Sequence, residues 1–492
     1  MPQKHTVQKK AIRPILHKTL EYIDKDPDEN LVKLANRISG IFSGLFPPEN
    51  FKKLKETAAD KDNIWRKFAL SIISDVDRNV VEQMLMSLGI DAGYYGTKTV
   101  RANREKMHCN VPFIILFDPT SACNLKCKGC WAAEYGYKQS LTNEEMQSIV
   151  SQGKELGTHF YMLTGGEPLI RKDDIITLAG NNPDCAFVIY TNATLVDQKF
   201  CEDMNRVGNI GLALSIEGTE QSNDWRRGDG SYKRTLEAMK LLKKNKCLFG
   251  VSICYTRPNI EFVTADSFID MLIEEGAKYA LCFNYMPIGH DADKELIPTS
   301  EQRKYMYNWL KKVRNSKTGK PIFIMDFQDD GEYVGGCIAG GRNYFHINSA
   351  GDIEPCVFIH YSDTNIRTHT LKQALQSPLF MQYYKNQPFN DNHLRPCPLL
   401  ENPERLGQMV KASGAHSSDL IHEESTDELY EKCADFAKEW APEAEKLWNS
   451  TKHRDTHTQY YCDTEEGKKE FAGCNGCCAE CAGKFAEADK KD

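Results

Sequence analysis

The sequence predicts an α/β protein whose core is an open, partial barrel of six or seven β–α units. Three observations carry this prediction. Strand-like apolar runs alternate with helix-like runs from about residue 111 to residue 328. A group of cysteines directly follows the first apolar run, where α/β folds place their chemistry. After residue 328 the alternation gives way to a hairpin-like pattern with further cysteines, so we expect a small β-hairpin and helical extension there.

The expected core is a parallel sheet with right-handed crossovers, because strand and helix patterns alternate repeatedly. The expected strands are Phe113–Phe117, Phe160–Leu163, Phe187–Tyr190, Ile210–Ile216, Phe249–Tyr255, Ala280–Tyr285 and Ile322–Phe327. The expected helices include Asn143–Leu156, Tyr232–Lys244, Phe268–Glu275 and Glu301–Arg314. No G-x-G-x-x-G opens a helix and no G-x4-G-K-[ST] is present, which disfavours the nucleotide-binding folds that carry these motifs.

The composition is that of a soluble globular chain. It has 492 residues, 41% of them hydrophobic, and a formal net charge of −7. We identify no secretory signal and no apolar run long enough to span a membrane. The 18 cysteines fall partly into clustered spacings, which favours reduced, metal-binding thiols in a cytoplasm over disulfides. The acidic balance and the lack of a basic stripe disfavour nucleic-acid binding.

The motif around which the chain is organised is C-x3-C-x2-C, formed by Cys123, Cys127 and Cys130 after the first expected strand. Thiolate is the soft ligand that iron–sulfur clusters select, and three thiolates leave the fourth iron of a cubane cluster open to a small molecule. A structural zinc would need a fourth protein ligand, and none lies within this loop. Spacing alone therefore favours an iron–sulfur cluster, with zinc or chance spacing as alternatives. The other core cysteines are interpreted as buried, inert thiols: Cys185, Cys201, Cys247, Cys254 and Cys282.

A second motif, Gly165-Gly166-Glu167-Pro168, follows the second expected strand. Its glycines permit close backbone approach, and its glutamate places a carboxylate beside the bend. Alone it would be read as an ordinary turn. Its position, one strand and one helix after the cysteine loop, makes that interpretation less favoured.

Together the two motifs resemble those of the radical S-adenosylmethionine (radical SAM) superfamily, over roughly Val111 to Phe327. The resemblance implies a [4Fe–4S] cluster whose open iron binds the amino and carboxylate groups of SAM. It also implies that an electron from this cluster cleaves SAM to methionine and a 5′-deoxyadenosyl radical, which takes hydrogen from an unactivated C–H bond. The protein's part is to position the cofactor and to exclude water.

The resemblance also implies SAM-binding residues. Gly165, Gly166 and Glu167 match the segment that accepts the methionine ammonium, Ser215 and Glu217 match polar positions near the ribose, and Arg227 matches an arginine that pairs with the SAM carboxylate. Asn192, after the third strand, is a further candidate. The family usually has an aromatic residue before the third cysteine, where this chain has Gly129; Trp131 is the candidate to supply the missing surface.

After residue 328, Cys337, Cys356 and Cys397 surround a hairpin-like stretch. The C-x13-G-x4-C spacing from Cys337 to Cys356 resembles the SPASM/twitch extension of radical SAM enzymes, which implies an auxiliary iron–sulfur cluster. The full SPASM run of cysteines is absent, so we expect one auxiliary cluster. Cys433 is a candidate fourth ligand, an open iron facing substrate is the alternative, and purely structural cysteines are the third interpretation.

We expect five segments: a helical N-terminal region (1–110), the radical SAM core (111–328), the auxiliary-cluster extension (329–400), a helical segment (401–450) and a linker with a cysteine-rich tail (451–492). The N-terminal region is either a helical cap on the core or an arm on a membrane surface or partner. The tail carries four cysteines that either bind zinc or a cluster or pack on nothing: Cys474, Cys477, Cys478 and Cys481.

The predicted function is a radical SAM enzyme that abstracts hydrogen from a peptide or protein. A lipid or other small-molecule substrate is the alternative. In another class, the alternative is a non-enzymatic iron–sulfur electron carrier or scaffold, which would need no SAM pocket. The enzyme would take electrons from a low-potential donor such as ferredoxin or flavodoxin. We expect a cytoplasmic location, with peripheral membrane contact through the N-terminal helices left open, and a cluster suited to an anaerobic organism.

Overall fold

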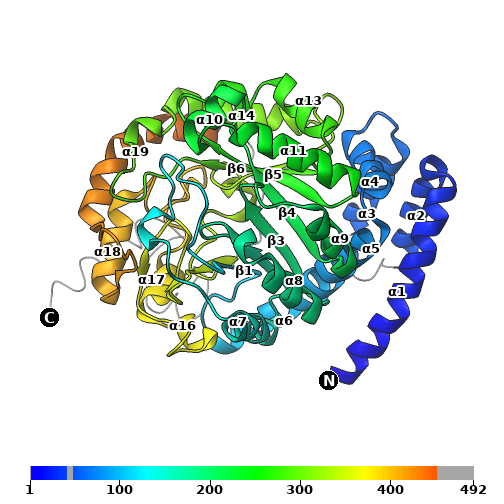
Figure 1. The fold of residues 1–492 in the computed structure, drawn as a ribbon, viewed down its shortest axis with the longest axis horizontal. Helices are drawn as coiled ribbons and strands as arrows, with labels where there is room; N and C mark the ends of the chain where they lie inside the picture. Colours follow the sequence, from blue (N-terminus) through cyan, green and yellow to red (C-terminus); the bar gives the residue numbers. More distant parts are fainter. Residues whose placement is uncertain (1, 42–47, 452–492) are drawn as a thin grey trace.

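The computed structural model describes residues 2–41 and 48–451, and its centre is a nine-stranded sheet with the order β7-β6-β5-β4-β3-β2-β1-β8-β9 (Figure 1). The strands are β1 Ile114–Phe117, β2 Phe160–Leu163, β3 Ala186–Thr191, β4 Ile210–Ser215, β5 Phe249–Tyr255, β6 Tyr279–Asn284, β7 Phe323–Asp326, β8 Tyr344–Ile347 and β9 Ile353–Glu354. Strands β1 to β8 pair in parallel, and β9 pairs antiparallel with β8. The prediction of an open, partial α/β barrel is confirmed.

Helices flank the sheet between successive strands (Figure 1). They are η2 Ala133–Tyr135, α7 Asn143–Leu156, η3 Pro168–Arg171, α8 Lys172–Asn181, α9 Gln198–Val207, α10 Glu220–Arg227, α11 Ser231–Lys244, α12 Ile260–Val263, α13 Asp266–Glu274, η4 Lys294–Leu296 and α14 Ser300–Val313. Local sequence sets their ends: α7 begins at a capping box between Thr142 and Glu145. It ends at Gly157, whose φ of +99° and close approach to Gly96 admit no side chain.

The N-terminal region is helical, as predicted. Its helices are α1 Pro2–Lys25, α2 Pro27–Ile41, α3 Pro48–Ala59, α4 Ile64–Asp75, α5 Arg78–Met84, the π-helix η1 Leu85–Gly96 and α6 Thr97–Met107. Leu20, Val80 and Val81 form a small apolar cluster with Ala186, the first residue of β3, so these helices cover the N-terminal side of the sheet. None of the described helices combines the length and the hydropathy that crossing a membrane requires.

The C-terminal part contains α15 Gly331–Val334, β10 Tyr361–Ser362, α16 Leu371–Ala374, α17 Pro378–Asn386, α18 Pro403–Ser413, β11 His416–Ser417 and α19 Thr426–Ser450. The predicted hairpin is present as β8 and β9, and it turns at Gly351 with a φ of +90°. One feature was not predicted: β8 pairs with β1, so the hairpin extends the core sheet. The cysteines expected in the tail, Cys474 to Cys481, lie outside the described residues.

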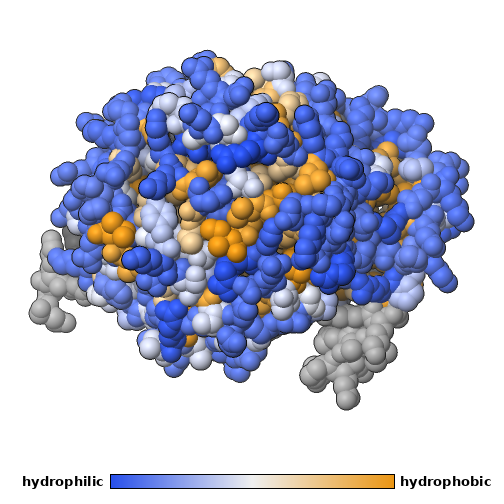
Figure 2. Space-filling view, viewed as in Figure 1, coloured by the Kyte–Doolittle hydropathy of each residue, from blue (hydrophilic) through white to orange (hydrophobic). Residues whose placement is uncertain are grey.

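Parallel pairing brings the carboxyl ends of these strands to one edge of the sheet, and the loops that leave them meet there. The loops after β1, β2 and β8 are therefore neighbours, although they are far apart in the sequence. On the face shown in Figure 2, hydrophobic residues gather toward the middle of the molecule while hydrophilic residues cover the periphery.

Candidate active site

The loop after β1 lies directly against the loop after β2. The backbone N–H groups of Gly166 and Glu167 donate to the carbonyls of Thr120 and Ala122 at 3.0 and 2.8 Å. A Cβ on Gly165 would lie 2.5 Å from the Thr120 oxygen, and φ is +111° there; a Cβ on Gly166 would lie 2.2 Å from the Ala122 oxygen. The glycine pair is therefore required by the close approach of the cysteine loop, and not only by a turn.

The carboxylate of Glu167 is fixed in one orientation. One of its oxygens accepts hydrogen bonds from the Thr191 hydroxyl at 2.7 Å and the Leu169 N–H at 3.0 Å, and the other accepts from the Asn192 N–H at 2.8 Å. Burial raises the pKa of Glu167, and these hydrogen bonds oppose that effect. Glu167 thus ties the end of β3 to the loop after β2 while it lines the pocket described below.

A second buried carboxylate, Glu217, holds two arginines. One of its oxygens accepts from Arg226 at 2.6 Å and from two nitrogens of Arg227 at 2.8 and 2.5 Å. Both arginines, Ser215 and Asn192 line the pocket, whereas Glu217 lies behind them, fully buried. The Arg227 guanidinium reaches within 4.0 Å of the Cys127 sulfur. Sequence reasoning singled out Arg227 but missed Arg226, because the pairing of both with Glu217 is visible only in three dimensions.

Tyr285, from the end of β6, occupies the space next to Gly129. A Cβ at position 129 would lie 2.6 Å from the Tyr285 ring and hydroxyl, and φ is +61° there. Trp131 instead packs edge-on against the rings of Tyr135 and His346, with centroids 6.1 and 5.8 Å away, and also against Phe358 and His360. Tyr285 and Trp131 both line the pocket. An aromatic side chain thus does lie beside the residue before the third cysteine, but it comes from the loop that follows β6.

The second cysteine group faces the same space. Cys337, Cys356 and Cys397 line one pocket together with Cys123, Cys127 and Cys130. Its cavity volume is about 240 Å³, and it is partly open to solvent. The lining of the pocket is mainly apolar and includes Ile114, Leu116, Met162, Tyr190, Phe283, Phe327, Val357 and Phe358. Cys254, expected to be an inert thiol, is also part of this wall. Cys433 is fully buried in α19 and is not among the lining residues.

The surroundings of these thiols suit iron–sulfur clusters. Backbone N–H groups point at the sulfurs: Leu125 at Cys123 (3.4 Å), Phe358 at Cys356 (3.5 Å), and Leu399 and Leu400 at Cys397 (3.4 and 3.3 Å). Such hydrogen bonds tune cluster sulfurs. Burial raises the pKa of Cys123 and of Cys356 to about 11 and that of Cys337 to about 12. The bare thiols are therefore protonated at neutral pH, and binding of iron must displace their protons.

Comparison with known proteins agrees with this geometry. A family profile described as the radical SAM superfamily matches residues 117–272. The chain is 26% identical over 293 residues to an AdoMet-dependent heme synthase of Methanosarcina barkeri, a match that covers 54% of this chain and 83% of that protein. It is 25% identical over 264 residues to the mycofactocin maturase MftC of Mycolicibacterium smegmatis, over 51% of this chain and 65% of MftC.

Solved structures with a similar arrangement were also found. Streptococcus suis SuiB bound to the precursor peptide SuiA has a TM-score of 0.48 and 18% identity, over 56% of this chain and 68% of SuiB. Native anSMEcpe with bound AdoMet has a TM-score of 0.47 and 18% identity, over 69% of this chain and all of that one. The cysteine loop, the Gly-Gly-Glu-Pro loop and the family match coincide on the same strands. The chain therefore contains a radical SAM domain at residues 117–272, and it is a radical SAM enzyme that uses a [4Fe–4S] cluster and SAM.

Proposed function

We propose that this enzyme abstracts hydrogen from a substrate held in the pocket between its two cysteine groups. The observation that carries the proposal is that all six cysteines line one pocket with largely apolar walls. When bound, the cluster and SAM supply the chemistry: one electron, cleavage of SAM, and a 5′-deoxyadenosyl radical. An apolar, partly enclosed pocket protects such a radical by keeping water and stray hydrogen donors away.

In this proposal Cys123, Cys127 and Cys130 hold the SAM cluster. SAM is bound by the backbone at Gly165 and Gly166 and by Glu167, Asn192, Ser215 and Arg227, all of which line the pocket. Glu217 has a different role. It lies on the side of Arg226 and Arg227 away from the pocket and holds both through hydrogen bonds, so that their remaining N–H groups face the pocket. A planar guanidinium held in this way is preorganised for a carboxylate.

Cys337, Cys356 and Cys397 would hold one auxiliary cluster. Its fourth ligand is either another protein group or a substrate atom, and Cys433 is disfavoured as that ligand because it lies among apolar side chains of α19 and outside the pocket. The buried Arg303–Glu401 pair supports this group, since the Glu401 carboxylate accepts a hydrogen bond from the Cys397 N–H at 2.8 Å.

A peptide or protein is the first substrate class we propose. The similarity to a protein named as a maturase supports it. A small apolar molecule is the second candidate, favoured by the apolar walls of the pocket and by the similarity to a protein named as a heme synthase. A low-potential donor such as ferredoxin or flavodoxin would supply the electrons. Peripheral membrane contact through the N-terminal helices stays a proposal, and co-sedimentation of the whole enzyme with anionic vesicles tests it.

The experiment that tests the function is the formation of 5′-deoxyadenosine from SAM. Anaerobically reconstituted wild type with a strong reductant should form the nucleoside, and Cys127→Ala should not. Cys109→Ala is the matched control, because Cys109 is a buried thiol away from the pocket and its variant should stay active. Parallel reactions with a peptide fraction and with a lipid and small-molecule extract identify the substrate class by which fraction stimulates turnover. No nucleoside from a fully loaded wild type would contradict the proposal.

A further inference from the structure

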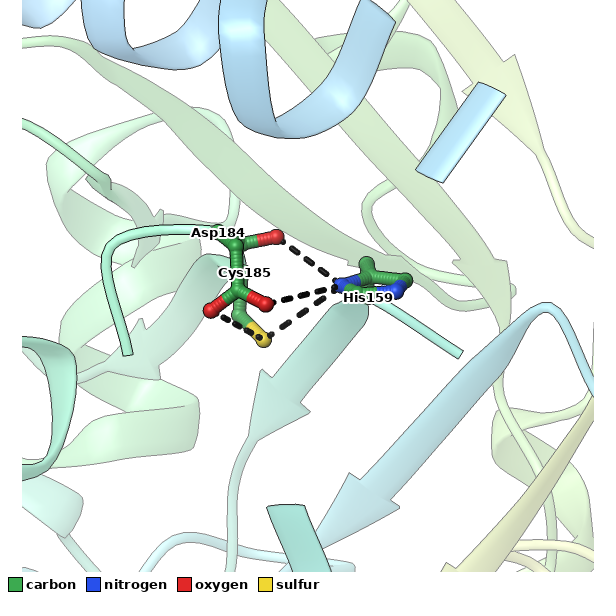
Figure 3. Close-up of side chains that lie close together, drawn as sticks. All are labelled: His159, Asp184 and Cys185. Carbon is green, nitrogen blue, oxygen red and sulfur yellow. Dashed lines mark hydrogen bonds and ion pairs between the residues drawn. The ribbon is translucent and has the colours of Figure 1, made fainter. Parts of the chain in front are cut away.

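Three potential metal ligands lie together at the opposite edge of the sheet. His159 directly precedes β2, and Asp184 and Cys185 directly precede β3. These two strands pair in parallel, with Phe160 opposite Ala186, and the N–H of Ala186 donates to the carbonyl of His159 at 2.9 Å. Strand pairing therefore places an imidazole, a carboxylate and a thiol side by side, as Figure 3 shows.

The site is separate from the active-site pocket. Parallel strands begin at one edge of a sheet and end at the other, and along β2 and the loop after it the pocket is lined by Met162 and by residues from Thr164 onward. At about 3.3 Å per residue, His159 lies about 10 Å along the strand from Met162, the first of these lining residues. None of the three residues lines the pocket.

The distances between the candidate ligand atoms are close to those of a tetrahedral zinc site. With Zn–S of about 2.3 Å and Zn–N and Zn–O of about 2.0–2.1 Å, tetrahedral ligand atoms lie about 3.3–3.6 Å apart. Here the His159 Nδ1 lies 3.6 Å from a carboxylate oxygen of Asp184 and 3.9 Å from the Cys185 sulfur. The sulfur lies 4.0 Å from the Asp184 oxygen that Lys154 contacts, and one ligand atom from each of the three residues lies within 4.8 Å of the other two. Small side-chain rotations would bring all three to bonding distance.

We propose that His159, Asp184 and Cys185 bind one zinc ion, which ties the starts of β2 and β3 together. Thiolate, imidazole and carboxylate are the ligand types that zinc takes in proteins. The fourth position would be filled by water or by the Asp184 carbonyl oxygen, which lies 3.0 Å from Nδ1. The His159 and Asp184 side chains are partly exposed, by 15% and 34%, and leave a path from solvent, while Cys185 is fully buried.

The neighbouring charge is compatible with this occupant. Lys154 of α7 contacts one Asp184 oxygen at 2.7 Å, which leaves the other oxygen, the one nearer His159, to the metal. Ligating carboxylates commonly keep such an outer hydrogen bond. Binding would move the imidazole proton to Nε2 and release the thiol proton.

The test is the zinc content of the iron- and sulfide-reconstituted holoenzyme after incubation with zinc and removal of loosely bound metal. We expect wild type to hold one zinc per chain more than His159→Gln or Cys185→Ser. Cys201→Ser is the matched control, because it alters another buried thiol, next to Cys247, and should keep the wild-type zinc content. His159→Gln changes a partly exposed side chain, so it decides the outcome if the buried Cys185→Ser fails to fold.

X-ray absorption at the zinc edge distinguishes this site from zinc bound by the cluster cysteines. The proposal requires one sulfur and otherwise nitrogen or oxygen neighbours. Zinc should also raise the melting temperature of wild type and of Cys201→Ser, but not that of the two site variants. Equal zinc contents in wild type and both site variants, or zinc surrounded by several sulfurs, would overturn the proposal. Neither result would bear on the radical SAM assignment, which rests on other residues.

Discussion

Replacing His346 should strongly destabilise the fold, because its imidazole joins two buried carboxylates. Its Nε2 lies 3.0 Å from Asp118 and its Nδ1 lies 2.6 Å from Glu354, and all three side chains are essentially fully buried. Burial acts to lower the pKa of His346, but Asp118 and Glu354 outweigh it and raise that pKa to about 10. The imidazole is therefore protonated in the folded enzyme at neutral pH.

The size of the effect follows from these contacts. Glu354 keeps three other donors, namely Tyr135 at 2.8 Å, Ser418 at 2.5 Å and Asn348 at 3.0 Å. Asp118 would lose the ion pair that compensates its charge. Removing one partner of a buried ion pair lowers the free energy of unfolding by about 3–5 kcal/mol. We therefore expect His346→Leu to lower the free energy of unfolding by that amount at about pH 7.

The pH dependence gives an independent check. A pKa raised from about 6.5 to about 10 contributes stability that is fully present below pH 6.5 and is lost as pH rises to 10. The retained proton makes the unfolding free energy of wild type fall by about 1.4 kcal/mol per pH unit in this window. The double variant Asp118→Asn/His346→Gln removes both titrating partners, so its stability should fall less steeply.

The assay is urea unfolding followed by circular dichroism, at equal metal loading and at several pH values between about 7 and 10. His416→Gln is the control, because His416 is an exposed histidine on β11. A loss below about 1 kcal/mol for His346→Leu, the size typical of an exposed pair, would refute the reasoning. Equal pH slopes for wild type and the double variant would refute it too.

Three further variants test the site. Gly129→Ala should reduce iron loading and SAM cleavage, since its Cβ would lie 2.6 Å from Tyr285 and a φ of +61° disfavours a side chain; Gly129→Ala/Tyr285→Ala should recover part of the loading. Cys397→Ala should lose roughly half of the iron while it still forms 5′-deoxyadenosine, and an unchanged iron content would contradict the auxiliary cluster. Arg303→Met should destabilise the enzyme by about 3–5 kcal/mol, because it leaves Glu401 buried without its cation; thermal melting measures this, and an unchanged melting temperature would contradict it.

Much of the fold was predictable because its signals are local. The apolar runs identified all seven core strands, with ends displaced by at most one residue, as for β6, expected at Ala280–Tyr285 and found at Tyr279–Asn284. The pairing of β8 with β1 was not predictable, because it joins segments more than 220 residues apart and leaves no pattern in either one. Periodicity reports which side chains face a core, but it does not report which strand lies next to which.

The candidate site also has features that local sequence predicts and features that form only when distant segments meet. The cysteine spacing and the glycine pair are local, and the structure places both at the pocket. Tyr285 beside Gly129, and Arg226 with Arg227 on Glu217, depend on loops that meet only in the folded chain. The sequence did carry one signal for Tyr285. Gly129 stands where the radical SAM family usually has an aromatic residue, which indicates that another side chain fills the space beside Gly129.

The position of β1 explains how the two cysteine groups come to share one pocket. β1 lies between β2 and β8, so its cysteine loop is flanked by the Gly-Gly-Glu-Pro loop on one side and by the hairpin that leads to Cys356 on the other. Neighbouring strands lie about 4.8 Å apart, and the backbone N–H of Asp118 donates to the carbonyl of Ile347 at 2.9 Å. Backbone pairing, reinforced by the His346 ion pairs, thus sets the spacing of the two groups before any metal binds. An enzyme built in this way can lose one cluster without losing the geometry of the other, which is why Cys397→Ala is expected to separate SAM cleavage from substrate turnover.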